Sequence, residues 1–178
     1  MTLSLGFIRD EHRNIARVLK ALEGLARDDA KLKNAIRSDL LASILYYLRV
    51  YPYAVHHPKE ERYLFPAAAK NAAGRAVVNA LYKEHAEGYA MLQQIEIAAA
   101  AGDGDLARLK GVILAFVAHE YRHMNREESE IIPAAERALT PEAIVAMRRQ
   151  FAPAGDPVFG ENVHAGFEAL FRHITEKA

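Results

Sequence analysis

Two stretches of the chain carry histidine and glutamate at the same spacing. The first begins at His56 and reads HHPKEERYLFP, and the second begins at His123 and reads HMNREESEIIP. In both, Glu-Glu follows the histidine at the fourth and fifth positions, and proline follows at the tenth. Residues four apart lie on one face of a helix, so His56 with Glu60, and His123 with Glu127, can reach one ion or neighbouring ions. Imidazole nitrogen and carboxylate oxygen together suit iron, manganese or zinc.

Two more histidines, His12 and His85, occupy positions where a bundle helix needs a hydrophobic residue. The apolar stripes around them consist of Leu5, Ile8, Ile15, Leu19, Leu22 and Ala26, and of Val78, Leu81, Gly88, Leu92, Ile95 and Ala99. Chance predicts roughly 0.7 His-x-x-x-Glu pairs for this composition, whereas the chain has four. Four histidines and two carboxylates are costly to bury without a partner, and a bound dication would remove that cost.

The elements that must position these residues are helices, because Ala, Leu, Glu, Lys and Arg dominate and alternating β-branched patterns are scarce. We expect a first helix through His12 that ends at RDDAKLKN. A second runs from about residue 36 toward residue 70, and Pro52, Pro58 and Pro66 kink or interrupt it. NAAGRA is the next break. A third helix then carries His85 and ends at AAGDGD, and a fourth spans about 109–134.

The remainder of the chain predicts two short helices. Thr140 is the expected N-cap of one, with Pro141 at its first position, and FAPAGDPVFG is a loop. The last helix is amphipathic, with Val163, Phe167, Leu170, Phe171 and Ile174 on its apolar face. Short connections favour antiparallel neighbours. The predicted fold is therefore an all-α, antiparallel up-down four-helix bundle over about 3–137, with a C-terminal helical extension over about 140–176, in a single domain of residues 1–178.

Composition narrows the function classes. The chain has 178 residues, no cysteine and equal numbers of basic and acidic side chains, 23 each. The absence of cysteine excludes disulfides, thiolate metal sites and cysteine nucleophiles. No net basic field would attract nucleic acid or an anionic membrane, and neither a signal peptide nor a membrane-spanning stretch is expected. We therefore expect a cytoplasmic protein with no nucleic-acid or membrane partner.

The segments DEHRNI, HHPKEERYLFP, KEHAEGY and HMNREESEIIP, in this order, resemble the hemerythrin family, and more closely its bacterial HHE cation-binding branch. The resemblance spans Leu3 to Arg137 and implies a non-haem di-iron site between four antiparallel helices. It implies two iron ions (Fe2+ or Fe3+, joined by an oxo or hydroxo bridge), with manganese or zinc as alternatives. The implied ligands are His12, His56, His85 and His123, with Glu60 and Glu127 as bridging carboxylates. Family members bind dioxygen reversibly, or sense or handle oxygen, nitric oxide or iron.

The chain departs from the oxygen-carrying hemerythrins at two ligand positions. They place a second histidine one turn after the third-helix ligand, where this chain has Tyr89, and their fourth helix has His-x-x-x-x-Asp in place of His-x-x-x-Glu. Tyr89 either ligates ferric iron or fills space, and His119 is an alternative replacement for the missing histidine. Simple oxygen carriage is therefore in question.

Several further residues have alternative assignments. His57 and Glu61 are alternates to His56 and Glu60, because Pro58 leaves the local phase of the helix open. Glu61 and Glu128 otherwise orient a ligand histidine through its outer ring nitrogen or are solvated. His164 and His173 lie outside the matched region, and we expect them to be surface or packing residues.

Three hypotheses follow. The first is a di-iron protein that binds or senses dioxygen or a related small molecule such as nitric oxide or peroxide, or that handles iron, and is not an enzyme. The second is an enzyme with the same site, a di-iron oxidase, peroxidase or nitric-oxide-reducing activity. The third is a structural or interaction bundle whose histidines are packing residues, or a site for zinc or another lone cation. Its last helix caps the bundle or forms a homodimer.

Overall fold

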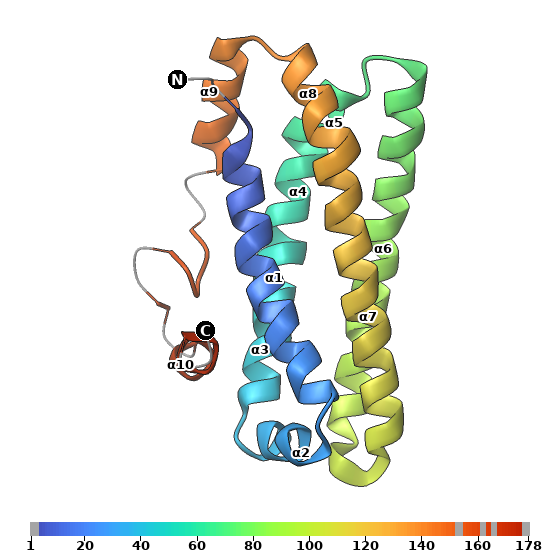
Figure 1. Ribbon diagram of the computed structural model, residues 1–178, viewed down its shortest axis with the longest axis vertical. Coiled ribbons are helices and arrows are strands. Elements are labelled where there is room, and N and C mark those ends of the chain that lie inside the picture. Colours follow the sequence, from blue (N-terminus) through green and yellow to red (C-terminus); the bar gives the residue numbers. More distant parts are fainter. Residues whose placement is uncertain (1–3, 152–154, 161–162, 165–166, 176–178) are drawn as a thin grey trace.

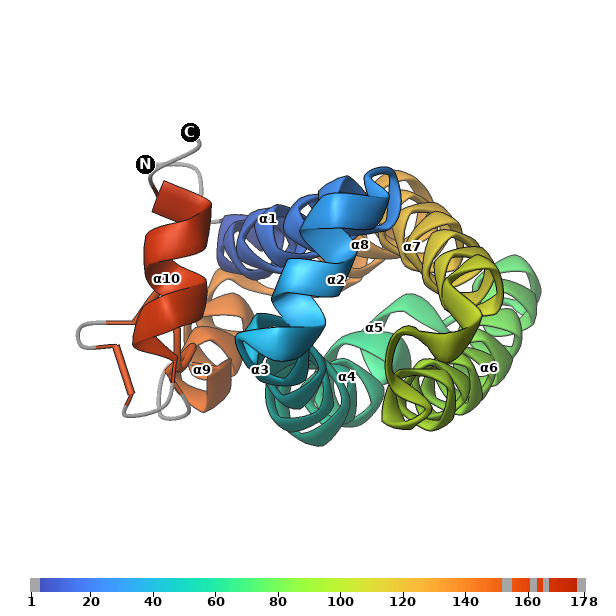
Figure 2. The same cartoon turned by 90° about the horizontal axis from the view of Figure 1, so that it is seen from below.

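The structure, a computed structural model, describes residues 4–151, 155–160, 163–164 and 167–175, and these residues form helices and no strand. The predicted all-α class is confirmed. Helical rods lie side by side along the long axis (Figure 1) and surround a shared interior when viewed from below (Figure 2). Two rods are the single helices α1 (Gly6–Ala26) and α6 (Ala72–Ala100).

The other two rods are composite. One consists of α3 (Leu40–Leu48), η1 (Arg49–His56), α4 (His57–Lys59), η2 (Glu60–Leu64) and α5 (Phe65–Ala68), and the other of α7 (Leu106–Arg126), η4 (Glu127–Ile131) and α8 (Ile132–Ala138). The segments η1, η2 and η4 are π-helical. Because these wider turns join α-helices end to end, each rod stays continuous.

The prolines explain the wider turns. A proline has no N–H and its ring crowds the carbonyl four residues earlier. Before Pro66, the N–H of Phe65 therefore bonds the Glu60 carbonyl, five residues back. Before Pro133, the N–H of Ile132 bonds the Glu127 carbonyl in the same way. Each repeat thus begins a π turn at its first glutamate. The expectation that the prolines kink or interrupt the second helix holds for its α-helical hydrogen bonding, which η1 and η2 interrupt, whereas the rod as a whole stays continuous.

Three predicted boundaries differ from the structure. RDDAKLKN does end the first helix, but it also begins α2 (Asp29–Arg37), since Asp28 accepts bonds from the N–H groups of Ala30 and Lys31. The second long helix accordingly starts at Leu40 and not near residue 36. The break predicted at NAAGRA is present but lies slightly earlier, at 69–71: Asn71 caps α6 and the remaining residues are its first turn. AAGDGD ends α6 as expected, with the 3₁₀ turn η3 (Gly102–Asp105) after it.

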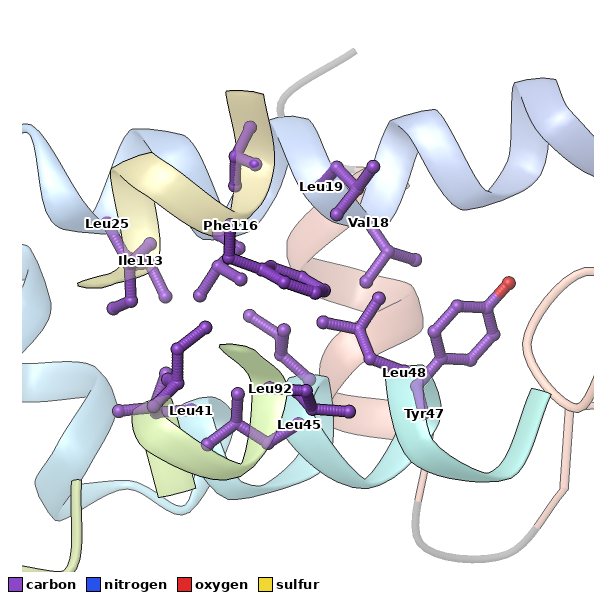
Figure 3. Close-up of a cluster of buried hydrophobic side chains, with 14 of the residues drawn as sticks. Val18, Leu19, Leu25, Leu41, Leu45, Tyr47, Leu48, Leu92, Ile113 and Phe116 are labelled. Carbon is purple, nitrogen blue, oxygen red and sulfur yellow. The ribbon is translucent and has the colours of Figure 1, made fainter. Parts of the chain in front are cut away.

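Two hydrophobic clusters fill the interior at different heights. The larger one includes Leu19, Leu48, Leu92 and Phe116 and is drawn in Figure 3. The other gathers side chains at the opposite ends of the same rods: Leu5, Ile8, Leu64, Phe65, Leu81 and Ile131. Buried histidines lie between these clusters along the rods: His12 on α1, His85 on α6 and His123 on α7. This polar layer is thus enclosed by a hydrophobic cluster on each side along the bundle axis.

The C-terminal extension packs on the outside of α1 and α3. Its first helix, α9 (Pro141–Phe151), begins as predicted, with Ala143 N–H bonded to the Thr140 hydroxyl. Its last helix, α10 (Glu168–Thr175), contacts α3 and α1 (Figure 2), and Phe167 stacks on Tyr46. Part of the expected loop, 152–154, lies outside the described residues. The apolar face of the last helix therefore covers the bundle itself.

Candidate metal centre

Two glutamates lie at the centre of the polar layer, both with no exposed surface. Glu60 Oε1 is 3.3 Å from Nε2 of His12 and 3.3 Å from Nε2 of His56. The second oxygen, Oε2, is 3.8 Å from Nε2 of His85. One carboxylate therefore directs its two oxygens toward histidines of different rods, which is the arrangement of a carboxylate that joins two ions.

Glu127 has the corresponding arrangement from the opposite rod. Its Oε2 is 3.3 Å from Nε2 of His12 and 3.4 Å from Nε2 of His123, and its Oε1 is 3.8 Å from Nε2 of His85. Nε2 of His85 also lies 3.1 Å from Nε2 of His123. The two glutamates and the inner nitrogens of four histidines thus converge on one small volume.

The inner oxygens are poorly satisfied by the protein alone. Glu60 Oε2 and both oxygens of Glu127 are buried and have no hydrogen-bond partner among the described residues. Leaving a charged group so placed costs several kcal/mol or more. Imidazole and carboxylate donors suit a divalent or trivalent first-row metal, so the residues present fit bound cations.

Among the described residues, two sets of donor atoms are close enough to hold an ion each. One set is His12, His56 and Glu60, and the other is His57, Glu60, His85 and His123; within each set the donors lie within 4.8 Å of one another. Glu60 belongs to both sets. His56 and His57, which the sequence left as alternates, therefore lie in neighbouring sets and are not mutually exclusive.

The outer nitrogens of the four histidines each meet a carboxylate. These Nδ1 contacts are His12 with Glu128 at 3.1 Å, His56 with Glu11 at 2.7 Å, His85 with Glu61 at 2.7 Å, and His123 with Glu84 at 3.2 Å. A carboxylate on Nδ1 holds the proton there, which leaves the Nε2 lone pair facing the interior and fixes the ring plane. We call these four residues the clamp glutamates.

The pKa values of the buried histidines and glutamates reflect how closely these side chains are packed. Burial alone would lower the pKa of His123, but Glu127 and Glu84 outweigh it and raise the pKa to about 9. Burial would likewise lower the pKa of His12, and its carboxylate neighbours raise it well above the usual value. Burial would raise the pKa of Glu127, and the histidines around it hold the pKa well below its usual range. The raised pKa values of His12 and His123 and the lowered pKa of Glu127 thus share one cause, the attraction between buried imidazoles and carboxylates.

His57 differs from the other histidines in the site. Its Nδ1 is buried without a hydrogen-bond partner among the described residues. Its ring stacks on His85 with centroids 4.0 Å apart and meets Tyr53 edge-on at 4.7 Å. Burial, aided by nearby histidines, lowers the pKa of His57 well below its usual value. The side chain is therefore held by ring packing rather than by a clamp.

The remaining candidates lie around the site. His119 belongs to neither donor set, and its Nε2 donates to the Glu84 carbonyl at 3.0 Å. Tyr89 is 37% exposed, with its ring 5.3 Å from that of Tyr53. His164 is exposed, His173 is partly buried, and neither belongs to a donor set.

Two clamp glutamates, Glu11 and Glu84, were not among the predicted site residues. Each directly precedes a lone histidine, in DEHRNI and in KEHAEGY. The repeated Glu-His dipeptide was the signal that could have identified them. Neighbouring residues on a helix point about 100° apart, so a glutamate before an inward histidine turns toward the adjacent rod.

A cavity of about 430 Å³ opens onto the site from one side. Its lining includes His57 and His85 from the donor sets, with Tyr53, Tyr82, Ala86 and Tyr89 around them. Tyr53 donates to Glu120 Oε1 at 2.8 Å. The cavity gives a small molecule a place beside the second donor set.

Comparison with known proteins identifies the domain. The sequence profile described as "Hemerythrin HHE cation binding domain" matches residues 4–135. No curated protein and no solved structure gives a significant match. No helix among the described residues combines the length and apolar character needed to cross a membrane. The matched region contains all six converging residues and all four clamp glutamates, and the chain therefore belongs to the hemerythrin HHE cation-binding domain family.

Proposed function

We propose that this protein holds two iron ions in an antiparallel up-down four-helix bundle and binds or senses dioxygen or a related small molecule such as nitric oxide or peroxide. His12 and His56 would hold one ion, His85 and His123 the other, and Glu60 and Glu127 would bridge them. The observation that carries the proposal is the pair of fully buried glutamates, each directed at histidines from different rods.

The protein's own part in this function is to prepare the donors. The clamp glutamates hold a proton on each Nδ1 and keep each Nε2 free for metal. The hydrophobic clusters above and below exclude water from the two ends of the polar layer. When bound, the two irons would supply reversible electron transfer to a small ligand. The donor set suits iron, manganese or zinc, and membership of the hemerythrin HHE family is the reason to propose iron first.

Metal analysis and absorption spectroscopy of freshly purified protein test this proposal. We expect two irons per chain and the near-ultraviolet absorption of a carboxylate-bridged ferric pair. Protein grown with iron that carries none, and that is fully folded without it, would contradict the proposal. Zinc found at one ion per chain would favour the structural bundle instead.

A second candidate is an enzyme with the same site. The cavity beside His57 and His85, with the hydrogen-bonded pair Tyr53–Glu120 next to it, favours this alternative because it brings a protonated phenol near the metal donors. Steady consumption of oxygen, peroxide or nitric oxide by the ferrous protein distinguishes turnover from simple binding. A single stoichiometric binding event with no further consumption would exclude this candidate.

The whole chain is proposed to act as one domain, with the extension of about 140–176 tied to the bundle. Lys59 Nζ donates to the Phe151 carbonyl at 2.7 Å, and the Tyr47 hydroxyl donates to Asp156 at 2.9 Å. Both contacts join the extension to the second rod and support this proposal. A cytoplasmic location and a homodimer stay predictions from the sequence.

A further inference from the structure

We propose that the cavity beside His57 is the route by which a small uncharged ligand reaches the metal pair, and that His57 is the side chain that gives way to admit it. This inference rests on the proposed function. It concerns the histidine that the sequence left as an alternate to His56, and it assigns the two residues different tasks.

The cavity reaches one donor set from the surface. His57 and His85 belong both to its lining and to the donor set that includes His123. Tyr82 and Tyr89 also line it and are 42% and 37% exposed. A small molecule entering between these tyrosines would meet the second donor set first.

The charges on the cavity wall are already paired. Arg49 forms an ion pair with Glu96, and Glu61 is the clamp on His85. Aromatic and alanine side chains make up most of the rest of the lining. The wall thus offers no free cation to select an anion, and its chemistry suits a diatomic gas or hydrogen peroxide.

His57 is the donor that can move at least cost. His12, His56, His85 and His123 would each break a contact between Nδ1 and a carboxylate on turning. The Nδ1 of His57 has no such contact among the described residues. Its ring rests on His85 and Tyr53, and ring packing is less directional than a charge-assisted hydrogen bond.

The opposite side of the site is closed at the equivalent positions. When the sequences of the two repeats are aligned at an offset of 67 residues, Met124 is equivalent to His57. When the segments around His12 and His85 are aligned at an offset of 73 residues, Ala16 is equivalent to Tyr89. Met124 is buried within the larger hydrophobic cluster. The position equivalent to His57 is therefore filled by a packed side chain, and entry is expected from the His57 side.

Stopped-flow binding of nitric oxide to the ferrous protein tests the route. Ala86→Phe puts a ring into the cavity wall, and Ala90→Phe makes the same change one turn further along α6, at an exposed position that does not line the cavity. We expect A86F to slow binding roughly tenfold, as about 1.4 kcal/mol in the entry barrier would, and A90F to match the wild type. Equal rates in A86F and A90F would overturn the route.

His57→Met tests the moving side chain, since methionine is the residue at the equivalent position of the second repeat. We expect nitric oxide to bind faster per iron-loaded molecule, because no imidazole has to turn away. A rate no faster than the wild type would overturn the role of His57. Excess azide is expected to leave the nitric oxide rate unchanged, and competition by azide would overturn the assignment to an uncharged ligand.

A measurement without metal separates this inference from the proposed function. In the metal-free protein, imidazole NMR should show slowly exchanging Nδ1–H signals from His12, His56, His85 and His123, and none from His57. A protected Nδ1–H on His57 would overturn the inference even if two irons bind. Iron absent from the wild type would contradict the proposed function, and the NMR result would still decide whether His57 is held.

Discussion

The two halves of the candidate metal centre are built alike, and they differ where the cavity lies. The first half is α1 with the rod α3–α5, and the second is α6 with the rod α7–α8. Each half contributes a Glu-His dipeptide from one rod and a His-x-x-x-Glu-Glu segment from the other. The Glu of the dipeptide clamps the histidine of its own half, as Glu11 does with His56 and Glu84 with His123.

The second glutamate of each repeat crosses between the halves. Glu61 clamps His85, and Glu128 clamps His12. The internal glutamates Glu60 and Glu127 face histidines of both halves. Each repeat therefore supplies a proposed ligand histidine, then a proposed bridging glutamate at which the π turn begins, and then a clamp for the other half.

The differences gather on one side. Unlike residues on this side include Tyr53 against Glu120, His57 against Met124, Gly88 against Ile15 and Tyr89 against Ala16. Tyr53 and Glu120 are hydrogen-bonded to each other, and a Cβ on Gly88 would collide with both. In the proposed function a nearly symmetric scaffold would hold two ions, and on the proposed route these local differences would give one of them an approach from solvent.

The largest expected effect comes from removing a bridge. We expect Glu60→Ala and Glu127→Ala each to lose paired iron binding, because each glutamate serves both halves. Metal content by mass spectrometry and loss of the bridged ferric absorption measure the effect. If one of the two variants keeps both irons, the halves are not equivalent and the proposed bridging role of that glutamate is wrong.

The pH dependence of the metal-free protein should separate His123 from His57. The pKa of His123 is about 9 when folded and about 6.5 when unfolded. Its contribution to the free energy of unfolding, on the order of 3 kcal/mol, is therefore fully present below pH 6.5 and is lost as pH rises to about 9. The pKa of His57 is lowered, so its contribution is lost as pH falls below about 6.5.

Urea unfolding of the metal-free protein from pH 5 to 10 measures both effects. His123→Gln should flatten the alkaline side of the curve, and His57→Met should flatten the acid side around pH 6. A wild-type curve that is level between pH 6.5 and 9 would contradict the assignment for His123.

The clamp glutamates should have a graded effect on metal affinity. Changing such a residue typically costs about 10–100-fold. Glu11 and Glu84 are 15% and 19% exposed at the side chain, whereas Glu61 and Glu128 are 37% and 39% exposed. We expect Glu11→Gln and Glu84→Gln to lose metal affinity near the upper end of this range. Glu61→Gln and Glu128→Gln should lose affinity near its lower end. Competition with a chelator measures the affinities, and a larger loss in E61Q than in E84Q would break this order.

The smallest expected effect is at Gly88. Gly88→Ala should destabilise the protein by about 1–3 kcal/mol, because the new methyl group collides with Tyr53 and Glu120. Gly111→Ala in α7 is the matched control: nothing lies within 4 Å of its added methyl, so it should stabilise by about 0.5–1 kcal/mol. Urea unfolding compares the two, and equal stability would show that the unlike positions are not tightly packed.

Much of the scaffold could be predicted because it depends on local patterns. The stripes around His12 and His85, the start of α9 at Pro141 and the end of α6 at Ala100 all follow from helix periodicity and capping. The prolines were harder to interpret. Pro66 and Pro133 break an α-helix in isolation, yet the neighbouring rods keep the chain helical and the turn widens instead.

By itself, the sequence determined the helical class, the family and the six residues that converge, because periodic spacing decides which side chains face the interior. Only the tertiary structure decided which carboxylate clamps which histidine, and that His57 lies in the site beside His56 rather than instead of it. Those pairings join residues as far apart as 116 positions, His12 and Glu128. They depend on how rods pack against one another, which no local pattern records.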